Sequence, residues 1–134
     1  MILGIGIDLI EVTRIKKLLQ EFGEKFLVKI FTPAEILAAE KKSVQKIAFY
    51  AKRFAAKEAF SKACGCGIGR GIDFLDIEIF NDEMGKPLLR VLNDKEKFLQ
   101  KKFAVENFVI HLSLTDENNL AQAMVIIEKS VCLT

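Results

Sequence analysis

RFAAKEAFSKA, from Arg53 to Ala63, is the stretch from which the fold of this chain is best inferred. It forms the second half of a helix predicted from Ser43 to Ala63, since the segment is rich in alanine, lysine and glutamate, which favour helices. The following run from Cys64 to Gly71 cannot continue the helix, because four of its eight residues are glycine. One helix face carries an apolar stripe that ends in two charges: Ile47, Ala51, Phe54, Glu58 and Lys62.

Glu58 lies where this stripe is expected to be buried. A buried carboxylate is costly unless a cation or hydrogen bonds compensate its charge. Lys62, one turn later, can form a solvated i,i+4 pair with Glu58. A bound metal ion can compensate the same carboxylate. The spacing alone leaves both interpretations open.

Asp8 raises the same question on a predicted strand at residues 2–10. Alternation places Gly4, Gly6 and Asp8 on one face of this strand, so we expect open space where a ligand approaches its backbone. Asp8 can cap the N-terminus of the next helix, where an acidic side chain interacts favourably with the helix dipole. Alternatively, Asp8 and Glu58 are the minimal carboxylate set for Mg²⁺, which takes its remaining ligands from water and phosphate.

The other elements predict an α+β fold, a mainly antiparallel sheet packed by helices. A helix follows the first strand and stops at Gly23, and Thr32-Pro33-Ala34-Glu35 is a helix start with a capping box. Asn93 and Glu96 are predicted to cap a short helix. Strands are predicted at residues 76–80, 88–92, 108–115 and 120–127.

Composition limits the possible classes of protein. With 134 residues, the chain is expected to be a single domain over residues 1–134. A net charge of +2 does not indicate nucleic-acid binding. The apolar start contains Asp8 and lacks a basic segment, so neither a signal peptide nor a membrane span is expected. Three cysteines argue against a disulfide framework and favour a cytoplasmic protein.

The histidine and the cysteines offer little further chemistry. A zinc site could be assembled from Cys64, Cys66, Cys132 and His111, but the C-x-C spacing is unusual for zinc. His111 shares a strand face with Ser113 and Thr115, which is typical of a surface residue, and no Ser–His–Asp triad can be inferred. The glycine run with Arg70 matches neither a Walker nor a dinucleotide-binding motif.

Three segments together resemble a known family. They are Gly4-Ile5-Gly6-Ile7-Asp8, the helix segment Arg53 to Ala63, and Gly85-Lys86-Pro87. The chain is similar in these segments, in length and in motif order to the short bacterial holo-acyl-carrier-protein synthases, the small branch of the 4′-phosphopantetheinyl transferases. The resemblance covers essentially the whole chain. It departs at Ser113-Leu114-Thr115-Asp116, where many relatives have Ser-x-Ser-His.

The resemblance implies an activity and a set of partners. Such enzymes transfer 4′-phosphopantetheine from coenzyme A to a serine of apo-acyl carrier protein, which leaves adenosine 3′,5′-bisphosphate and supports fatty acid biosynthesis. They are homotrimers with active sites between neighbouring subunits. The main alternative is a trimeric adaptor that uses a basic helix to hold acidic partners, but it leaves Glu58 without an explanation.

The resemblance also assigns roles to individual residues. Asp8 and Glu58 match the Mg²⁺ ligands, and Lys62 matches a catalytic lysine beside the scissile phosphate. Glu58, or a metal-bound water that it orients, is the candidate base. Coenzyme A is expected to contact a larger set: Arg53, Lys62, Gly85, Lys86, Pro87 and His111.

Two surfaces are expected to bind protein. Arg14 and Lys17 share a face of the first predicted helix, and a basic patch there suits an acidic carrier protein. The last two predicted strands carry more apolar residues than one sheet face needs, including Val109, Met124 and Ile126. We therefore expect this surface to be buried against copies of the same chain.

Overall fold

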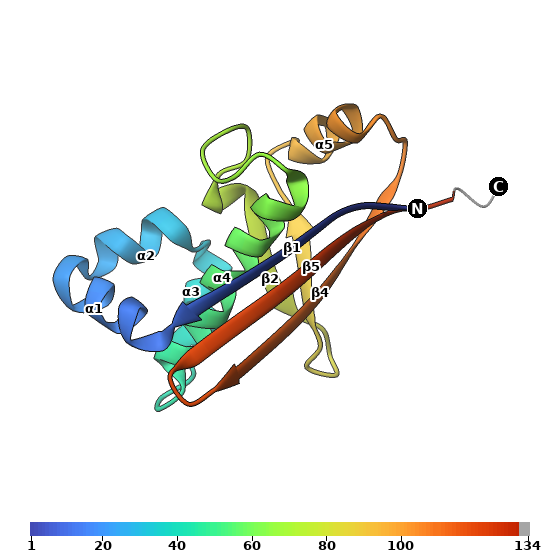
Figure 1. Ribbon diagram of the computed structural model, residues 1–134. Coiled ribbons are helices and arrows are strands. Elements are labelled where there is room, and N and C mark those ends of the chain that lie inside the picture. Colours follow the sequence, from blue (N-terminus) through green and yellow to red (C-terminus); the bar gives the residue numbers. More distant parts are fainter. Residues whose placement is uncertain (132–134) are drawn as a thin grey trace.

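The fold is α+β, as predicted, in a computed structural model that describes residues 1–131 (Figure 1). Its elements are, in order, β1 (Ile2–Glu11), α1 (Val12–Phe22), α2 (Glu24–Ile30), α3 (Pro33–Glu40), α4 (Lys46–Cys64), a short 3₁₀ helix (Phe74–Asp76), β2 (Ile77–Asn81), β3 (Pro87–Val91), α5 (Lys95–Phe103), β4 (Phe108–Glu117) and β5 (Leu120–Lys129). Among these residues, no helix is long and apolar enough to cross a membrane.

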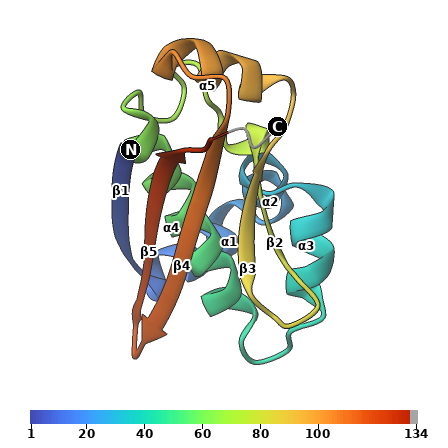
Figure 2. The ribbon, with the colours of Figure 1, turned by 90° about the vertical axis from the view of Figure 1, so that its right-hand side faces the viewer.

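The long helix α4 is the centre of the molecule. It packs across a three-stranded antiparallel sheet with strand order β1-β5-β4, chiefly against β1 and β5. The hairpin β2-β3 forms a second antiparallel sheet, and β3 runs beside β4 (Figure 2). Most of α4 is buried because neighbours surround it, so its apolar residues do not form a single stripe. The predicted helix is therefore correct, but its amphipathic pattern is weaker than the stripe suggested.

The two glycines of β1 allow α4 to approach the sheet closely. A Cβ atom added to Gly4 would lie 1.9 Å from the carbonyl oxygen of Ala63, and one added to Gly6 would lie 1.8 Å from that of Ala59. On β5, Ala121 faces the same interior and is fully buried. The expectation that the glycines leave open space for a ligand was therefore wrong, because the backbone of α4 occupies that space.

Replacing Gly6 with alanine should strongly destabilise the fold. The added methyl meets a helix carbonyl oxygen, which no side-chain rotation can move, so strand and helix must separate. We expect a loss of about 3 kcal/mol in the free energy of unfolding, measured by urea denaturation. Gly6→Ala combined with Ala59→Gly should not recover it, since the obstructing atom belongs to the backbone. Recovery in this double variant would contradict the steric explanation.

Several local predictions are confirmed and one is wrong. Thr32 caps α3, and its hydroxyl accepts a hydrogen bond from the Glu35 amide while the Glu35 carboxylate accepts one from the Thr32 amide, at 3.3 and 2.8 Å. All four later strands form close to their predicted bounds. Asn93 does not cap α5, however. Asp94 precedes that helix in a left-handed conformation, and the Asn93 amide donates instead to Asp76.

A buried charge network that sequence reasoning missed joins three elements. The Lys57 ammonium is fully buried and donates to a Glu35 carboxylate oxygen at 2.7 Å and to the carbonyl oxygens of Ile30 and Phe74 at 2.7 and 3.0 Å. The second carboxylate oxygen of Glu35 accepts a hydrogen bond from the Ile79 amide at 2.9 Å. The network therefore links α4, the start of α3 and strand β2.

Within residues 1–131, the outer face of the three-stranded sheet has no covering layer. Ile5, Ile7 and Leu9 are 63%, 51% and 59% exposed, respectively, and Met124 on β5 is 42% exposed. The register places Ile7 opposite Met124, so their side chains form one continuous apolar surface. We call the surface formed by Ile5, Ile7, Leu9 and Met124 the outer apolar face.

Candidate active site

The structure brings Asp8, Glu58 and Lys62 together where β1 passes α4. The Lys62 ammonium donates to an Asp8 carboxylate oxygen at 3.2 Å and to the carbonyl oxygen of Ile7 at 2.9 Å. Lys62 therefore pairs with Asp8 and not with Glu58, so the interpretation of an i,i+4 pair was wrong. Asp8 does not cap the following helix either, because Glu11 occupies the capping position of α1 and forms no side-chain cap.

The charge of Glu58 is only partly compensated. Burial raises the pKa of this carboxyl above its ordinary value, and the negative charge of Asp8 raises it further. Lys62 and Arg14 act in the opposite direction on the same pKa. Two carboxylates thus lie within electrostatic reach of each other, with Lys62 and Arg14 as the cations that act on Glu58.

This donor set fits a hard divalent cation. Mg²⁺ binds through one or two carboxylates and keeps positions for water and phosphate oxygens, which matches a pair of carboxylates with no further ligand. Residues 1–131 contain no cluster of three or more His, Cys, Asp and Glu side chains that could hold a metal. The alternative zinc site also included Cys132, which lies outside the described residues.

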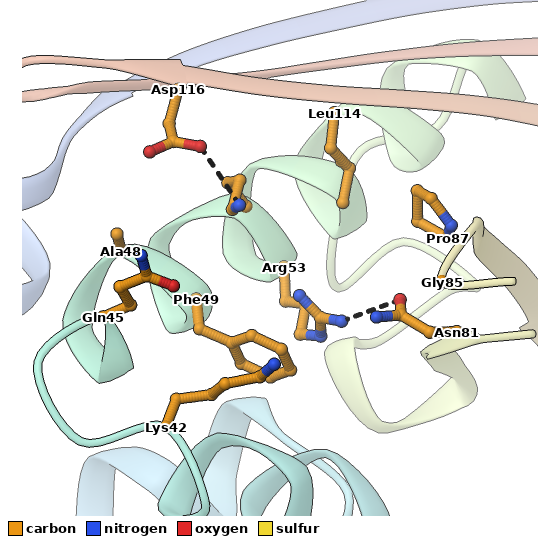
Figure 3. A pocket seen from close by; sticks show the side chains of 11 residues that line it. Lys42, Gln45, Ala48, Phe49, Arg53, Asn81, Gly85, Pro87, Leu114 and Asp116 are labelled. Atoms are coloured by element: carbon orange, nitrogen blue, oxygen red, sulfur yellow. Dashed lines mark hydrogen bonds and ion pairs between the residues drawn. The ribbon is translucent and has the colours of Figure 1, made fainter.

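A separate pocket of about 330 Å³ lies at the other side of α4 (Figure 3). Three of its walls are α4 with the segment before it, the hairpin β2-β3, and the end of β4. It brings together three of the predicted coenzyme A residues, namely Arg53, Gly85 and Pro87. Lys86 lies between the latter two and is exposed. The other lining residues are Lys42, Gln45, Ala48, Phe49, Lys52, Asn81, Leu114 and Asp116.

Arg53 is held rigidly in this pocket. Its guanidinium carbon lies 3.3 Å from the centre of the Phe49 ring, and it donates a hydrogen bond to the Asn81 amide oxygen at 3.1 Å (Figure 3). Arg53 is 3% exposed, and its Nε atom is buried without a hydrogen-bond partner. Burial lowers the pKa of Arg53 to about 10, so the side chain stays charged at neutral pH. A buried cation with an unused donor is suited to bind an anion.

The two groups of predicted residues lie on different faces of α4. Glu58 lies five positions after Arg53 and Lys62 lies nine positions after it. At about 100° per residue, their side chains point about 140° and about 180° away from that of Arg53. His111 lies further away, on the outer face of the sheet, where its Nε2 atom is 3.1 Å from a carboxylate oxygen of Glu128. Within one chain, the structure therefore does not bring His111 or Arg53 to the carboxylate pair.

The predicted docking residues are exposed on α1. The guanidinium of Arg14 lies 5.9 Å from the centre of the Phe54 ring, so it extends toward the carboxylate pair, whereas Lys17 faces solvent. Arg14 therefore connects the basic face of α1 with Glu58.

Several residues of the pocket could not be identified from the sequence. Phe49, Asn81 and Asp116 are far apart in the chain, and none belongs to a motif that indicates a site. Lys42 and Lys52 are ordinary surface residues by their sequence context. Only the packing of β4 and the β2-β3 hairpin beside α4 brings them together.

Comparisons with known proteins agree with this fold. The sequence-family model of the 4′-phosphopantetheinyl transferase superfamily matches residues 4–123. The chain therefore belongs to this superfamily. The holo-[acyl-carrier-protein] synthase of Pelagibacter ubique is 44% identical over 128 residues, which cover 96% of this chain and 98% of that protein. The family resemblance found in the sequence is thereby confirmed.

Solved structures give the same result. The holo-(acyl-carrier-protein) synthase of Bacillus anthracis, in complex with CoA (3′,5′-ADP), is 42% identical and superposes with a TM-score of 0.79 over 97% of this chain and 99% of that chain. The holo-[acyl-carrier-protein] synthase of Neisseria meningitidis is 36% identical, with a TM-score of 0.84 over 96% of this chain and 100% of that chain.

Proposed function

We propose that this protein transfers 4′-phosphopantetheine from coenzyme A to a serine of apo-acyl carrier protein and releases adenosine 3′,5′-bisphosphate. The observation that carries the proposal is the group formed by Asp8, Glu58 and Lys62, where two carboxylates and one ammonium meet on a rigid scaffold. The relatives named above support it, since they are holo-acyl-carrier-protein synthases and one of them was solved with CoA (3′,5′-ADP).

The direct test is mass spectrometry of a purified apo-acyl carrier protein after incubation with the enzyme, coenzyme A and Mg²⁺. The carrier should gain the mass of one phosphopantetheine group. A variant carrier with its acceptor serine replaced by alanine is the matched control and should gain none. If the native carrier keeps its mass under these conditions, the proposed function is wrong.

Asp8 and Glu58 are proposed to hold Mg²⁺. When bound, the metal neutralises charge on the coenzyme A diphosphate. The Lys62 ammonium, held by Asp8 and the Ile7 carbonyl, is placed to approach the transferred phosphoryl group and stabilise its growing negative charge. Glu58, or a water that it orients, is the candidate to accept the proton of the attacking serine hydroxyl.

We further propose that each complete active site combines two chains of a homotrimer. Arg53 and the carboxylate pair point away from each other on α4, so a single coenzyme A bound to one chain does not engage both faces of the helix. His111 also lies on a surface that a neighbouring copy can reach. The outer apolar face supplies area for such contacts.

The trimer is tested by light scattering at micromolar protein concentration. The expected mass is three chains. Ile7→Lys places a charge in the outer apolar face and should shift the protein toward the monomer and lower transfer activity together. The matched control is Val44→Lys, at an exposed residue before α4. A fully active wild-type monomer would rule out the two-chain site.

The acidic carrier protein is proposed to dock on the basic face of α1. Lys17→Glu should raise KM for the carrier about tenfold and leave KM for coenzyme A unchanged, with a smaller effect at high salt. Arg14→Glu is less specific, because Arg14 also acts on Glu58. The control is Lys97→Glu on α5, a similar charge reversal on a different helix. Equal changes in both KM values after Lys17→Glu would contradict this docking surface.

A further inference from the structure

The pocket around Arg53 contains one negatively charged residue among several positively charged ones. Three cations line it, namely Lys42, Lys52 and Arg53, together with a single carboxylate, Asp116. The Lys52 ammonium lies 3.0 Å from an Asp116 carboxylate oxygen. Their side chains are 28% and 39% exposed, so the pair lies at the rim of the pocket and not in its floor.

The fold brings Asp116 into the pocket from a different element than Lys52. Asp116 follows Leu114 on the same face of β4, the face that packs toward α4, and both residues line the pocket (Figure 3). Lys52 is the neighbour of Arg53 on α4. The Asp116 carboxylate therefore extends from β4 toward α4 and pairs with Lys52. Lys52 is adjacent in the sequence to Arg53, the most buried cation of the pocket.

The rest of the pocket is prepared for an anion. Arg53 lines the pocket, is 3% exposed, and is held in place by Phe49 and Asn81. Because solvent screens a largely buried cation less than an exposed one, its attraction for an anion in the pocket is stronger. The anion that fits a guanidinium and two ammonium groups is a phosphate monoester, which carries close to two negative charges at neutral pH.

Asp116 is expected to lower the affinity of this pocket for a phosphate group. Its carboxylate already satisfies Lys52, and its negative charge repels a phosphate that enters beside it. The pocket walls are partly buried, so solvent screens this repulsion less than on an open surface. An amide at the same position would keep the size and hydrogen bonding of the side chain and remove the repulsion.

We propose that Asp116 is an affinity-setting residue for a nucleotide that carries a phosphate monoester: in the free protein it holds Lys52, and on binding it competes with the phosphate for that ammonium. The inference rests on the proposed function, in which coenzyme A and adenosine 3′,5′-bisphosphate both carry a 3′-phosphate monoester. Asp116 thereby weakens retention of the bisphosphate product, which shortens the time that the product occupies the site.

The test is isothermal titration of adenosine 3′,5′-bisphosphate into the wild type and Asp116→Asn. The variant should bind this ligand about tenfold more tightly, and the gain should shrink as salt is raised. Adenosine, which carries no phosphate, should bind both proteins equally. The matched control is Glu117→Gln, the adjacent strand residue, which removes the same charge from the opposite face and should leave both affinities unchanged.

Lys52→Gln tests whether Asp116 acts through Lys52. In that background, Asp116→Asn should tighten bisphosphate binding by clearly less than the tenfold gain in the wild type, because only the direct repulsion is removed and there is no ammonium left to release. A full tenfold gain in that background, or unchanged or weaker binding of the bisphosphate by Asp116→Asn itself, overturns the proposal. If the wild type transfers phosphopantetheine while Asp116→Asn keeps the wild-type affinity, only the role of Asp116 is refuted. A wild type that modifies no carrier protein refutes the proposed function instead.

Discussion

Glu58→Gln should lower the rate of phosphopantetheine transfer about a thousandfold at saturating Mg²⁺, and Asp8→Asn should have a similar effect. Each change keeps the size of the side chain and removes one negative charge that we assign to metal binding. Steady-state kinetics with coenzyme A and a carrier protein measures the loss. Lys62→Ala should affect the apparent Mg²⁺ affinity less but still slow the transfer, because its proposed partner is the transferring phosphoryl group.

The fold should survive the substitution at Glu58. The charge of Asp8 raises the pKa of Glu58, so neutralising Glu58 removes a repulsion, and the melting temperature should rise or stay the same. Asp8→Asn also weakens the contact with Lys62 and is the less clean of the two tests. Glu24→Gln, at an exposed position of α2, controls for loss of charge. A Glu58→Gln protein with more than about a tenth of wild-type activity would overturn the assignment.

Lys57→Met should strongly lower the free energy of unfolding, in contrast to Glu58→Gln, which should lower activity and leave the fold intact. It removes the ammonium that pairs directly with the buried Glu35 and leaves that carboxylate without its hydrogen-bonded cation at the junction of α3, α4 and β2. Breaking such a buried pair costs about 3–5 kcal/mol in the free energy of unfolding. Chemical denaturation followed by circular dichroism measures it.

Two further variants separate the buried pair from a general effect of charge on α4. Lys46→Met removes an exposed lysine of the same helix, 3.5 Å from Glu40, and should change stability by less than about 1 kcal/mol. Lys57→Met combined with Glu35→Gln leaves no buried charge and should recover part of the loss. Equal stability of Lys57→Met and the wild type would show that the network contributes nothing.

Most of the architecture could be predicted from the sequence, because local signals specify it. The capping box at Thr32, the glycine-rich end of α4 and the alternating strands each act over a few residues. The helix α2 was not predicted, and the role of Gly6 was interpreted in the wrong direction. A glycine in a strand indicates that something approaches the backbone, but the sequence does not say whether this is a ligand or a helix.

The site could be predicted only in part. Asp8, Glu58 and Lys62 were selected from motifs, and the structure does place them together. Which carboxylate Lys62 contacts depends on the distance between β1 and α4, and the two glycines determine that distance. The buried Lys57 could not be distinguished from its exposed neighbours by pattern, because α4 is covered on nearly all sides. The pocket around Arg53 is formed by contacts between distant segments, which no local signal reveals.

The turn between β4 and β5 connects the two regions that we propose to bind the substrates. Asn119 at this turn accepts hydrogen bonds at the start of α1, with its carbonyl oxygen 2.8 Å from the Val12 amide and its side-chain oxygen 3.0 Å from the Thr13 amide. Three residues earlier, the same hairpin carries Asp116 into the pocket around Arg53. The helix proposed to receive the carrier protein and the pocket proposed to hold the nucleotide therefore share one support. A substitution at Asn119 is therefore expected to disturb both surfaces together.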